Sequence, residues 1–350
     1  MNFQQADFNE LSKPTRKRYI SVLFFVFLAI GLIYGFTRFG IGANEIEVSS
    51  DDETFWGKVS NLFTVSSERN ITLDNDPDYS IPKPEKDRWD ILILGIRGED
   101  DENAEEAGAM LTDTIMILSY EKTSQKTSLV SIPRDLFVRI TNDKTDKINS
   151  AYEIGALNNG GISFAKKIFS RITGIYIDNV IVLDFSSFKQ IIDDLGGIDV
   201  ELDKPFMEKQ QWGYEFNLPA GINHLDGPTT LYYARSRFST SDFDRAQRQQ
   251  KIILAVKDKI SELSLLSDPI KTLSILKTIH NNIETDLKLW DAGSLLDLAK
   301  EFNNSGDKIR RYLITTENLV YEGHINNLYV LLPQGDNLQG IKNLFQEILQ

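Results

Sequence analysis

Arginines are concentrated between Leu231 and Lys251, in the stretch LYYARSRFSTSDFDRAQRQQK. Arginine stays charged at every working pH, and its planar fork of donors matches phosphate oxygens two at a time. Closely spaced arginines beside carboxylates therefore indicate a site for an anionic, metal-bound phosphate. The alternative is a charged helix with salt bridges on its surface, and composition alone does not decide between the two. The polar side chains of the stretch are Arg235, Arg237, Asp242, Asp244, Arg245, Arg248, Gln249 and Gln250.

A helix predicted over residues 243–259 would order the second half of this stretch. It would place Arg245 and Gln249 on one side, at i and i+4, with Arg248 one turn on from Arg245. A shorter helix, predicted over 227–233, would lead into the first two arginines. Asp244 suits the N-cap of the longer helix as well as it suits a catalytic role.

The elements that position this stretch begin at residue 89, where short apolar runs start to alternate with helical patterns. This alternation predicts an α/β domain of three layers, with helices on both faces of one mixed central sheet. We find no linker before the C-terminal elements, so we assign 89–350 to one domain with a C-terminal extension. Strands are predicted over 90–94, 113–120, 127–132, 179–185, 199–202, 311–315 and 327–332, and further helices over 162–172, 186–195, 268–281, 289–302 and 338–349.

The N-terminal segment predicts a membrane anchor. Residues 19–36 run YISVLFFVFLAIGLIYGF without a charge, which is just long enough to cross a hydrocarbon core as a helix. The cations before this run outnumber Arg38 after it, which places the N-terminus in the cytoplasm. We therefore predict a cytoplasmic tail (1–18), a transmembrane helix (19–38) and an extracellular linker (39–88). A cleaved signal peptide is the competing interpretation, and a buried core helix is the third.

Composition excludes several classes of function. The net charge of −13 argues against a nucleic-acid protein, which would normally present a basic face. The chain has no cysteine, so a disulfide, a zinc–thiolate site and a thiol nucleophile are all impossible. Its three histidines are scattered without ligand spacing, which makes a histidine-based metal site or catalytic triad a poor interpretation.

Several motifs then follow one another between about residues 90 and 260: DILILGI, LTDTIMILSY, SLVSIPRDLFVRI, KINSAYEIG, VIVLDFSSFKQIIDDLGGIDVEL and the arginine stretch itself. In these motifs and in their order the chain resembles the LytR-CpsA-Psr family of cell-envelope glycopolymer phosphotransferases. A membrane anchor followed by an extracytoplasmic catalytic domain is also the layout of that family. The resemblance covers roughly half of the chain.

The resemblance implies an activity. Members of the family move a glycan phosphate from a polyprenyl-pyrophosphate carrier to a cell-wall or envelope acceptor, with the help of magnesium, and release the lipid monophosphate. The lipid tail would lie in an apolar channel between the sheet and the helices. The implied site residues are Arg134, Arg235, Arg237 and Arg245 on the pyrophosphate, Asp242 to orient them, Lys147 and Gln249 for substrate binding, and Asp113 for magnesium. We add Arg248 to the substrate-binding residues because the predicted helix places it one turn on from Arg245.

Two positions depart from the family pattern. Many members have an aspartate, a second metal ligand, where this chain has Arg97, and an arginine where it has Leu111. The adjacent loop offers Glu99, Asp100 and Asp101 as replacements for the missing carboxylate, and Arg97 itself offers a replacement for the missing cation. We take both replacements as hypotheses.

The departures leave functions of different classes open. The arginine set favours a glycopolymer transferase at the membrane. The arginine at position 97 favours a polyprenyl-pyrophosphate binding protein or envelope regulator that performs no transfer. Hydrolysis of the same pyrophosphate would use the same residues, with water as the acceptor. The sequence identifies neither the glycan nor the acceptor.

Overall fold

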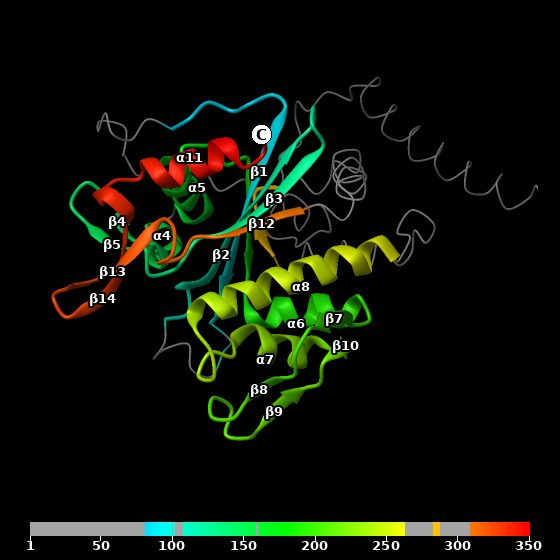
Figure 1. Ribbon diagram of the computed structural model, residues 1–350. Helices are drawn as coiled ribbons and strands as arrows, with labels where there is room; N and C mark the ends of the chain where they lie inside the picture. Colours follow the sequence, from blue (N-terminus) through cyan, green and yellow to red (C-terminus); the bar gives the residue numbers. More distant parts are fainter. Residues whose placement is uncertain (1–80, 100, 102–107, 159, 263–282, 288–308) are drawn as a thin grey trace, which may run out of the picture. The chain divides into compact units, whose positions relative to one another are not determined.

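The computed structural model describes residues 81–350, except for 100, 102–107, 159, 263–282 and 288–308 (Figure 1). The predicted tail, the transmembrane helix and most of the predicted linker lie outside these residues, as do the helices predicted over 268–281 and 289–302. Within the described part of the chain, none of the helices is both long and apolar enough to span a membrane.

A six-stranded sheet forms the centre of the described part. Its middle strands are β1 (Arg88–Ile96) and β2 (Thr112–Glu121), which pair antiparallel from Arg88 opposite Glu121 to Ile96 opposite Thr112. β3 (Lys126–Ser131) continues antiparallel from β2, whereas β6 (Asn179–Leu183) is parallel to β1 and β12 (Ile309–Leu313) is parallel to β3. β11 (Glu284–Thr285) adds an antiparallel edge. The prediction of a mixed sheet is therefore confirmed.

Alternate residues of the strands pack against different helices, as the two-residue period of a strand requires. Leu92 and Leu94 of β1 belong to a core cluster with α5 (Gly161–Thr173) and α11 (Gln339–Glu347). Ile91 and Ile93 face the opposite way, into a cluster that includes Ile253 of α8 (Asp242–Glu262). Figure 1 shows α4 (Ala151–Leu157), α5 and α11 on one side of the sheet and α6 (Phe185–Asp194), α7 (Gly227–Arg235) and α8 on the other.

A third core cluster lies below α8, away from the central sheet (Figure 1). It is built from α6, α7 and two small two-stranded sheets, in which β7 (Ile198–Leu202) pairs with β10 (Gly221–Leu225) and β8 (Phe206–Glu208) with β9 (Phe216–Leu218). Phe206 stacks edge-to-face on Tyr233 of α7, with ring centroids 5.1 Å apart. This cluster supports the far side of α8.

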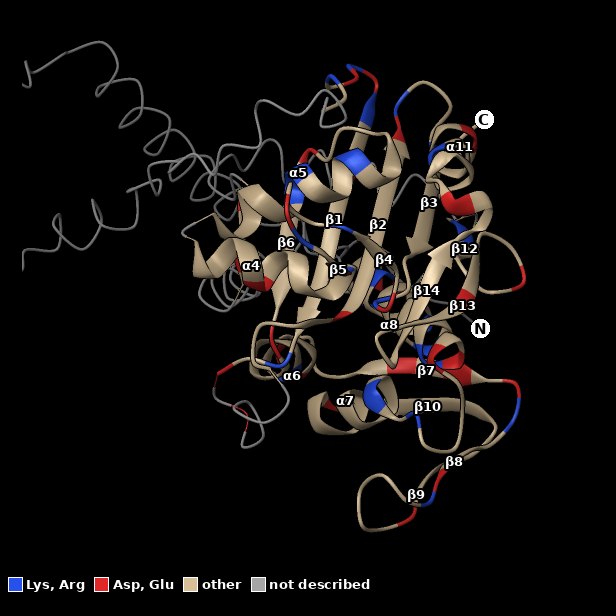
Figure 2. Cartoon of the chain, turned by 90° about the vertical axis from the view of Figure 1, so that its left-hand side faces the viewer, with Lys and Arg blue, Asp and Glu red and all other residues tan. Residues whose placement is uncertain are grey.

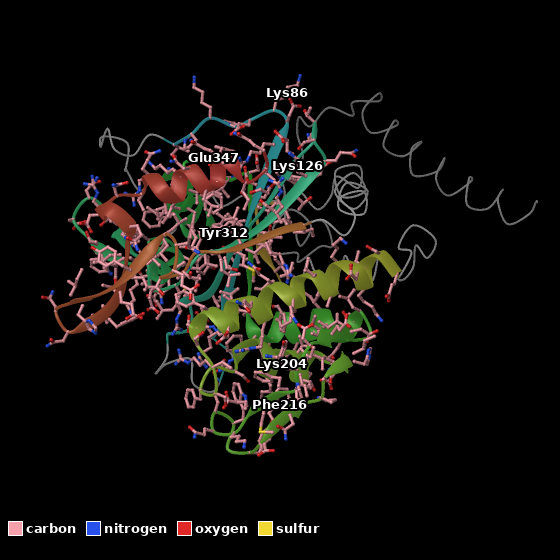
Figure 3. The ribbon with its side chains drawn as sticks, in the orientation of Figure 1. Lys86, Lys126, Lys204, Phe216, Tyr312 and Glu347 are labelled. Carbon is pink, nitrogen blue, oxygen red and sulfur yellow. The ribbon has the colours of Figure 1, made fainter. Side chains whose placement is uncertain are left out.

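Gln250 fixes α8 on the sheet. Its side chain is almost fully buried, and Nε2 donates to Ser131 Oγ over 2.9 Å and to the backbone carbonyl of Tyr312 over 3.0 Å. These acceptors belong to β3 and to the edge strand β12, and Figure 3 labels Tyr312 on β12. A buried amide without hydrogen-bond partners is costly, so these two hydrogen bonds fix the position of α8 along the strands.

The long elements were predicted well and several short ones were missed. The missed strands are β4 (Phe137–Arg139), β5 (Thr145–Lys147), β8, β9, β10, β11 and β13 (Val320–Ile325), which pairs with the predicted β14 (Leu328–Pro333). The missed helices are α4 and two 3-10 turns, Ile148–Ser150 and Gln334–Asp336. Figure 2 shows few charges along the central strands, while charged residues concentrate in helices and loops.

Candidate functional site

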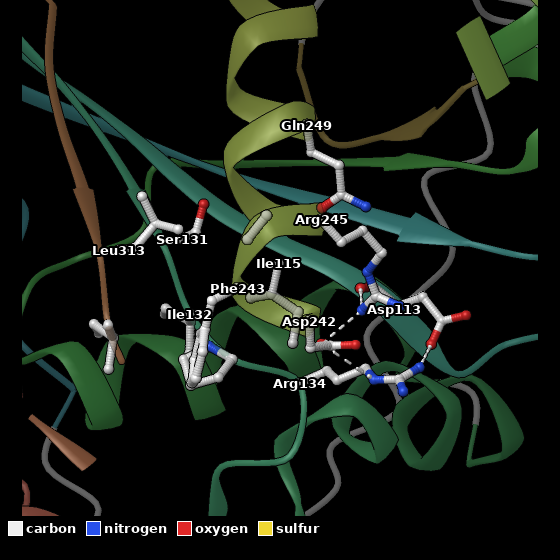
Figure 4. Close-up of a pocket in the computed structure, with 13 residues that line it drawn as sticks. Asp113, Ile115, Ser131, Ile132, Arg134, Asp242, Phe243, Arg245, Gln249 and Leu313 are labelled. Carbon is white, nitrogen blue, oxygen red and sulfur yellow. Dashed lines mark hydrogen bonds and ion pairs between the residues drawn. The ribbon is translucent and has the colours of Figure 1, made fainter. Parts of the chain in front are cut away.

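A small pocket opens where β2 begins, β3 ends and α8 begins (Figure 4). Its rim is charged or polar and contains Asp113, Arg134, Asp242, Arg245 and Gln249. Its remaining lining is almost entirely apolar and comprises Ile115, Ser131, Ile132, Pro133, Phe243, Ala246, Leu313 and Ile314. A charged rim above an apolar wall suits an amphiphile with an anionic head.

The start of α8 delivers two of the rim residues. Ser241 and Asp244 form a capping box: the Ser241 backbone N–H donates to Asp244 Oδ2 over 2.9 Å, and the Asp244 N–H donates to Ser241 Oγ over 3.1 Å. The predicted N-cap at Asp244 is therefore wrong, because Ser241 occupies that position. The box fixes the first turn, from which Asp242 and Arg245 project together at i and i+3.

Arg245 connects α8 to β2. Its side chain is only 7% exposed, and Nη2 donates both to Asp242 Oδ2 over 2.9 Å and to the backbone carbonyl of Asp113 over 3.1 Å. Burial lowers its pKa, and the nearby charges of Arg134 and Arg237 act in the same direction, whereas Asp242 and Asp113 oppose the shift. The guanidinium is thus held in a partly dry, cation-rich position.

Arg134 comes from the other side of the pocket, just after β3. It pairs through Nη1 with Asp113, and its Nε lies 3.7 Å from Asp135 Oδ2 and 3.8 Å from Asp242 Oδ2. Burial disfavours its charge, but the carboxylates around it outweigh burial and raise its pKa. The Nε atoms of Arg134 and Arg245 are both buried and have no hydrogen-bond partner among the described residues.

Of the two other predicted substrate-binding residues near Arg134 and Arg245, Gln249 lines the pocket and Lys147 does not. Gln249 lines the pocket one turn after Arg245 and donates through Nε2 to the Ala234 carbonyl over 3.3 Å. Lys147 does not line it; its Nζ pairs with Asp135 Oδ1 over 2.6 Å. Asp135 therefore joins the two cations, a role that the sequence analysis missed although this residue directly follows Arg134.

The other predicted arginines lie elsewhere. Arg235, at the end of α7, lines a separate cleft, and its guanidinium lies 4.1 Å from the ring centre of Phe185. The side chain of Arg237 is exposed, and its charge reaches Arg245. Arg237 is fixed through its backbone N–H, which donates to Gln211 Oε1 over 2.6 Å.

Arg248 is turned toward the protein rather than toward the pocket. Its side chain is buried, with Nε donating to the Tyr233 carbonyl over 3.1 Å, Nη1 to Thr240 Oγ1 over 3.0 Å, and Nη2 to the Ser236 carbonyl. These contacts tie α8 to the turn after α7. The predicted role in substrate binding therefore has no support in this geometry, because the donors already serve the fold.

Asp113 is the candidate metal ligand. One of its carboxylate oxygens pairs with Arg134, and its side chain is about one-third exposed. No cluster of three or more histidine or acidic side chains that could hold a metal is present among the residues the structure describes. Magnesium is often bound by one or two carboxylates with substrate phosphates and water as the other ligands, so Asp113 fits this ion only together with a bound phosphate.

The proposed substitutes for a second metal ligand are placed differently from one another. Asp101 accepts from Arg97 Nη1 over 2.9 Å, and Glu99 is exposed. Asp100 lies outside the described residues. Arg97 lines the same cleft as Arg235.

Comparisons with known proteins agree with the geometry. The model of the LytR_cpsA_psr family matches residues 58–347. Polyisoprenyl-teichoic acid–peptidoglycan teichoic acid transferase TagV of Bacillus subtilis is 30% identical over 271 residues, which span 75% of this chain and 65% of that protein. The enzyme called TagU in Oceanobacillus iheyensis is 30% identical over 283 residues, which span 78% of this chain and 81% of TagU. The crystal structure of B. subtilis TagV matches with a TM-score of 0.60 at 28% identity, covering 76% of this chain and 98% of that one.

Proposed function

The chain belongs to the LytR-CpsA-Psr family, and from this premise we propose that it is a glycopolymer phosphotransferase. It moves a glycan phosphate from a polyprenyl-pyrophosphate carrier to a cell-wall or envelope acceptor. The relatives TagV and TagU carry names that state a transfer of teichoic acid from a polyisoprenyl carrier to peptidoglycan. The glycan and the acceptor of this chain are left general.

The observation that carries the proposal is the rim of the pocket. Arg134 and Arg245 approach from β3 and α8, with Asp242 between them, and each keeps a buried Nε without a partner among the described residues. Buried donors without acceptors are costly unless a ligand satisfies them. A pyrophosphate offers acceptor oxygens to both guanidinium groups at once. The apolar residues behind the rim suit the first units of a polyprenyl tail.

The chemistry follows from this placement. An acceptor oxygen attacks the glycan-side phosphorus, a new P–O bond forms, and the bond to the lipid-side phosphate breaks, so that the lipid monophosphate leaves. Phosphoryl transfer needs positioning and charge stabilisation more than covalent assistance from the protein. Arg134 and Arg245 neutralise the phosphate oxygens, while Asp242 and Asp135 keep the Arg134 guanidinium in place.

Magnesium is part of the proposal. Asp113, together with substrate phosphate oxygens and water, would hold the ion, which would add positive charge at the reacting phosphates. Asp113 also orients Arg134 through their ion pair. The two roles are compatible because a carboxylate has two oxygens.

We propose that the protein acts outside the cytoplasmic membrane and is anchored by its apolar N-terminal segment. Residues 19–36 carry no charge, and more cations precede them than follow them. A polyprenyl carrier resides in the membrane, so an anchored domain would meet its substrate there.

Transfer is tested with the full chain in detergent, a short-chain polyprenyl-pyrophosphate saccharide, magnesium and fragments of cell-wall glycan. We expect release of lipid monophosphate together with covalent attachment of the saccharide to the wall fragment. Arg134→Ala should abolish both products, while Arg311→Ala, on the exposed side of β12, should change neither.

Other results separate the alternatives. Lipid monophosphate formed with free saccharide phosphate, in the presence of every acceptor tried, would identify a hydrolase. Saturable binding of the lipid without release would identify a binding protein. Either result would overturn transfer as the function of this chain.

A further inference from the structure

The hairpin of β13 and β14 has no part in the proposed function, and none of its residues lines the pocket (Figure 1). Its last strand pair joins Ile325 to Leu328, which leaves a turn of two residues. Asn326 and Asn327 form this turn, with φ values of +50° and +63°. Two left-handed residues in succession are characteristic of a type I′ turn, whose twist matches that of the strands, so the turn fixes the register of the hairpin.

The hairpin lies directly beside the segment that carries Arg134. The Leu331 N–H donates to the Asp135 carbonyl over 2.9 Å, and Leu331 forms a parallel bridge with Leu136. Leu331 is 3% exposed and belongs to the same core cluster as Leu136 and Ile132. A backbone hydrogen bond and a buried side chain therefore both hold β14 against this segment.

One face of the hairpin carries Glu322, His324 and Tyr329, and we call it the hairpin face. Tyr329 precedes Leu331 by two residues, so both side chains lie on the same face of β14. His324 is directly opposite Tyr329, with ring centres 5.8 Å apart, and the Tyr329 hydroxyl donates to Glu322 Oε1 over 3.2 Å. The face that is buried at Leu331 thus continues beyond the core as a row of polar and aromatic groups.

The hairpin face lies close to the carboxylates that surround Arg134. Partial burial raises the pKa of Tyr329 to about 12, the hydrogen bond and charge of Glu322 act in the same direction, and the charges of Asp135 and Asp242 raise it further. Oxygens of these two aspartates lie 3.7 and 3.8 Å from Arg134 Nε. Together with the backbone hydrogen bond to Asp135, these charges place the hairpin face beside the charged rim of the pocket.

The hairpin face is open to a ligand. Tyr329 is 38% exposed, and the neighbouring Leu328 is 46% exposed. Glu322 and His324 are exposed as well, and Glu322 Oε2 has no hydrogen-bond or ion-pair partner in the described part of the chain. An open aromatic ring can pack against the C–H groups of a sugar, while a carboxylate and an imidazole form hydrogen bonds with its hydroxyl groups.

Charge makes the hairpin face better suited to a neutral ligand than to a phosphate. Glu322 contributes a negative charge to it, and Asp135 and Asp242 add theirs from the rim of the pocket. The hairpin sequence, VYEGHINNLYVLLP, contains no lysine or arginine. Because like charges repel, an uncharged saccharide fits here better than the anionic head of the donor.

We propose that Glu322, His324 and Tyr329 form an acceptor subsite, in which a neutral saccharide of the acceptor glycan binds beside the pocket. The subsite rests on the proposed function and deepens it, because transfer needs an acceptor hydroxyl held next to the donor phosphate. Arg134 and Arg245 hold that phosphate, and the hairpin, fixed to the same segment as Arg134, holds the sugar. A filled subsite also favours transfer over hydrolysis, since the sugar takes the place of water.

Binding is tested on the full chain in detergent with two probes, chitotetraose for the subsite and geranyl diphosphate for the pocket. In NMR titrations, Glu322→Gln and Tyr329→Ala should weaken chitotetraose binding about tenfold, as expected for loss of a hydrogen bond to a charged group or of a stacking ring, and leave geranyl diphosphate unchanged. Tyr329→Phe, which keeps the ring, should have a smaller effect. Tyr321→Phe is the matched control, because Tyr321 lies on the opposite face of the same hairpin and should change neither affinity.

Turnover gives a second readout. With a short-chain polyprenyl-pyrophosphate saccharide as the donor, Glu322→Gln and Tyr329→Ala should raise KM for the acceptor about tenfold and leave KM for the donor unchanged. The share of product released as free saccharide phosphate should rise, because water then competes better for the donor. A purely structural role would lower the melting temperature and affect donor and acceptor alike, and thermal unfolding of each variant checks this.

The outcomes keep the subsite and the proposed function apart. An absence of chitotetraose binding, or affinities that Glu322→Gln and Tyr329→Ala leave unchanged, would overturn the subsite. Transfer that neither variant impairs would overturn the subsite and leave the proposed function standing. Chitotetraose binding that depends on both residues, in a chain that performs no transfer, would overturn the proposed function and leave a glycan-binding site.

Discussion

Arg245 Nη2 donates to the backbone carbonyl of Asp113 over 3.1 Å and so joins two residues that are 132 positions apart. One belongs to the first turns of α8 and the other to the start of β2. The same nitrogen lies 2.9 Å from Asp242 Oδ2. The rim of the pocket is therefore assembled across the domain, and its geometry depends on how α8 is seated on the sheet.

Arg245→Ala should weaken binding of geranyl diphosphate by roughly 10- to 100-fold, the range expected for loss of a hydrogen bond to a charged group. Arg245→Lys should restore little of the affinity, because an ammonium lacks the planar fork that lets arginine contact Asp113, Asp242 and a phosphate at once. The measurement is a binding titration, with Arg311→Ala as the exposed arginine control. Near-normal affinity in Arg245→Lys would show that only charge matters at this position.

Asp113→Asn should raise the magnesium concentration needed for half-maximal release of lipid monophosphate, by about tenfold or more, since magnesium strongly prefers a carboxylate. Asp242→Asn is the matched control. Asp242 contacts the same two arginines, so its loss should lower the rate while leaving the magnesium requirement where it was. If both variants shift the magnesium requirement equally, the ion is not held by Asp113.

The long elements could be predicted because their patterns are strong. The apolar run of β1 and the polar and apolar periods of α5 and α8 each indicate one structure over many residues. Only the order of the motifs predicted that four charged residues would meet at one pocket, because they come from three separate segments of the chain. These residues are Asp113, Arg134, Asp242 and Arg245.

What could not be predicted is where each arginine points. Arg245 and Arg248 lie three residues apart on α8, a spacing that puts them on the same side of the helix, so the helical period could not separate their roles. One reaches the pocket and the other reaches the carbonyls of Tyr233 and Ser236. The short hairpins were missed because two or three paired residues leave almost no period to detect.

Stability should depend on pH through Asp178. Burial raises the pKa of this carboxyl to about 6, and the charge of Asp90 acts in the same direction. The folded state then binds more protons than the unfolded chain between about pH 4 and 6, so the free energy of unfolding falls as pH rises through this window. The fall should reach at most about 3 kcal/mol.

Urea unfolding at both ends of the window, for the wild type and Asp178→Asn, measures this difference. Asparagine keeps an oxygen that can accept from the Asp90 N–H, the bond that Asp178 makes over 2.8 Å. Asp90 also has a raised pKa and its charge acts on Asp178, so the difference between the curves reports Asp178 together with its interaction with Asp90. Asp258→Asn, an exposed position, should follow the wild type. Parallel curves for Asp178→Asn and the wild type would exclude this linkage.

Arg248→Ala should act on stability rather than on substrate affinity. Its guanidinium holds the carbonyls of Tyr233 and Ser236 and the hydroxyl of Thr240, and it lies 4.9 Å from the ring centre of Phe206. Truncation leaves buried acceptors unpaired, so the free energy of unfolding should fall by about 3 kcal/mol. Urea unfolding measures this loss.

Binding of geranyl diphosphate to the folded fraction of Arg248→Ala should stay within about twofold of the wild type, because the side chain does not line the pocket. Arg245→Ala should instead lower the affinity for geranyl diphosphate, because Arg245 faces the ligand. Arg248→Met, which keeps the aliphatic stem against Phe206, should recover part of the stability and none of the polar contacts. A large loss of affinity in a stably folded Arg248→Met would instead show that this arginine contributes to substrate binding.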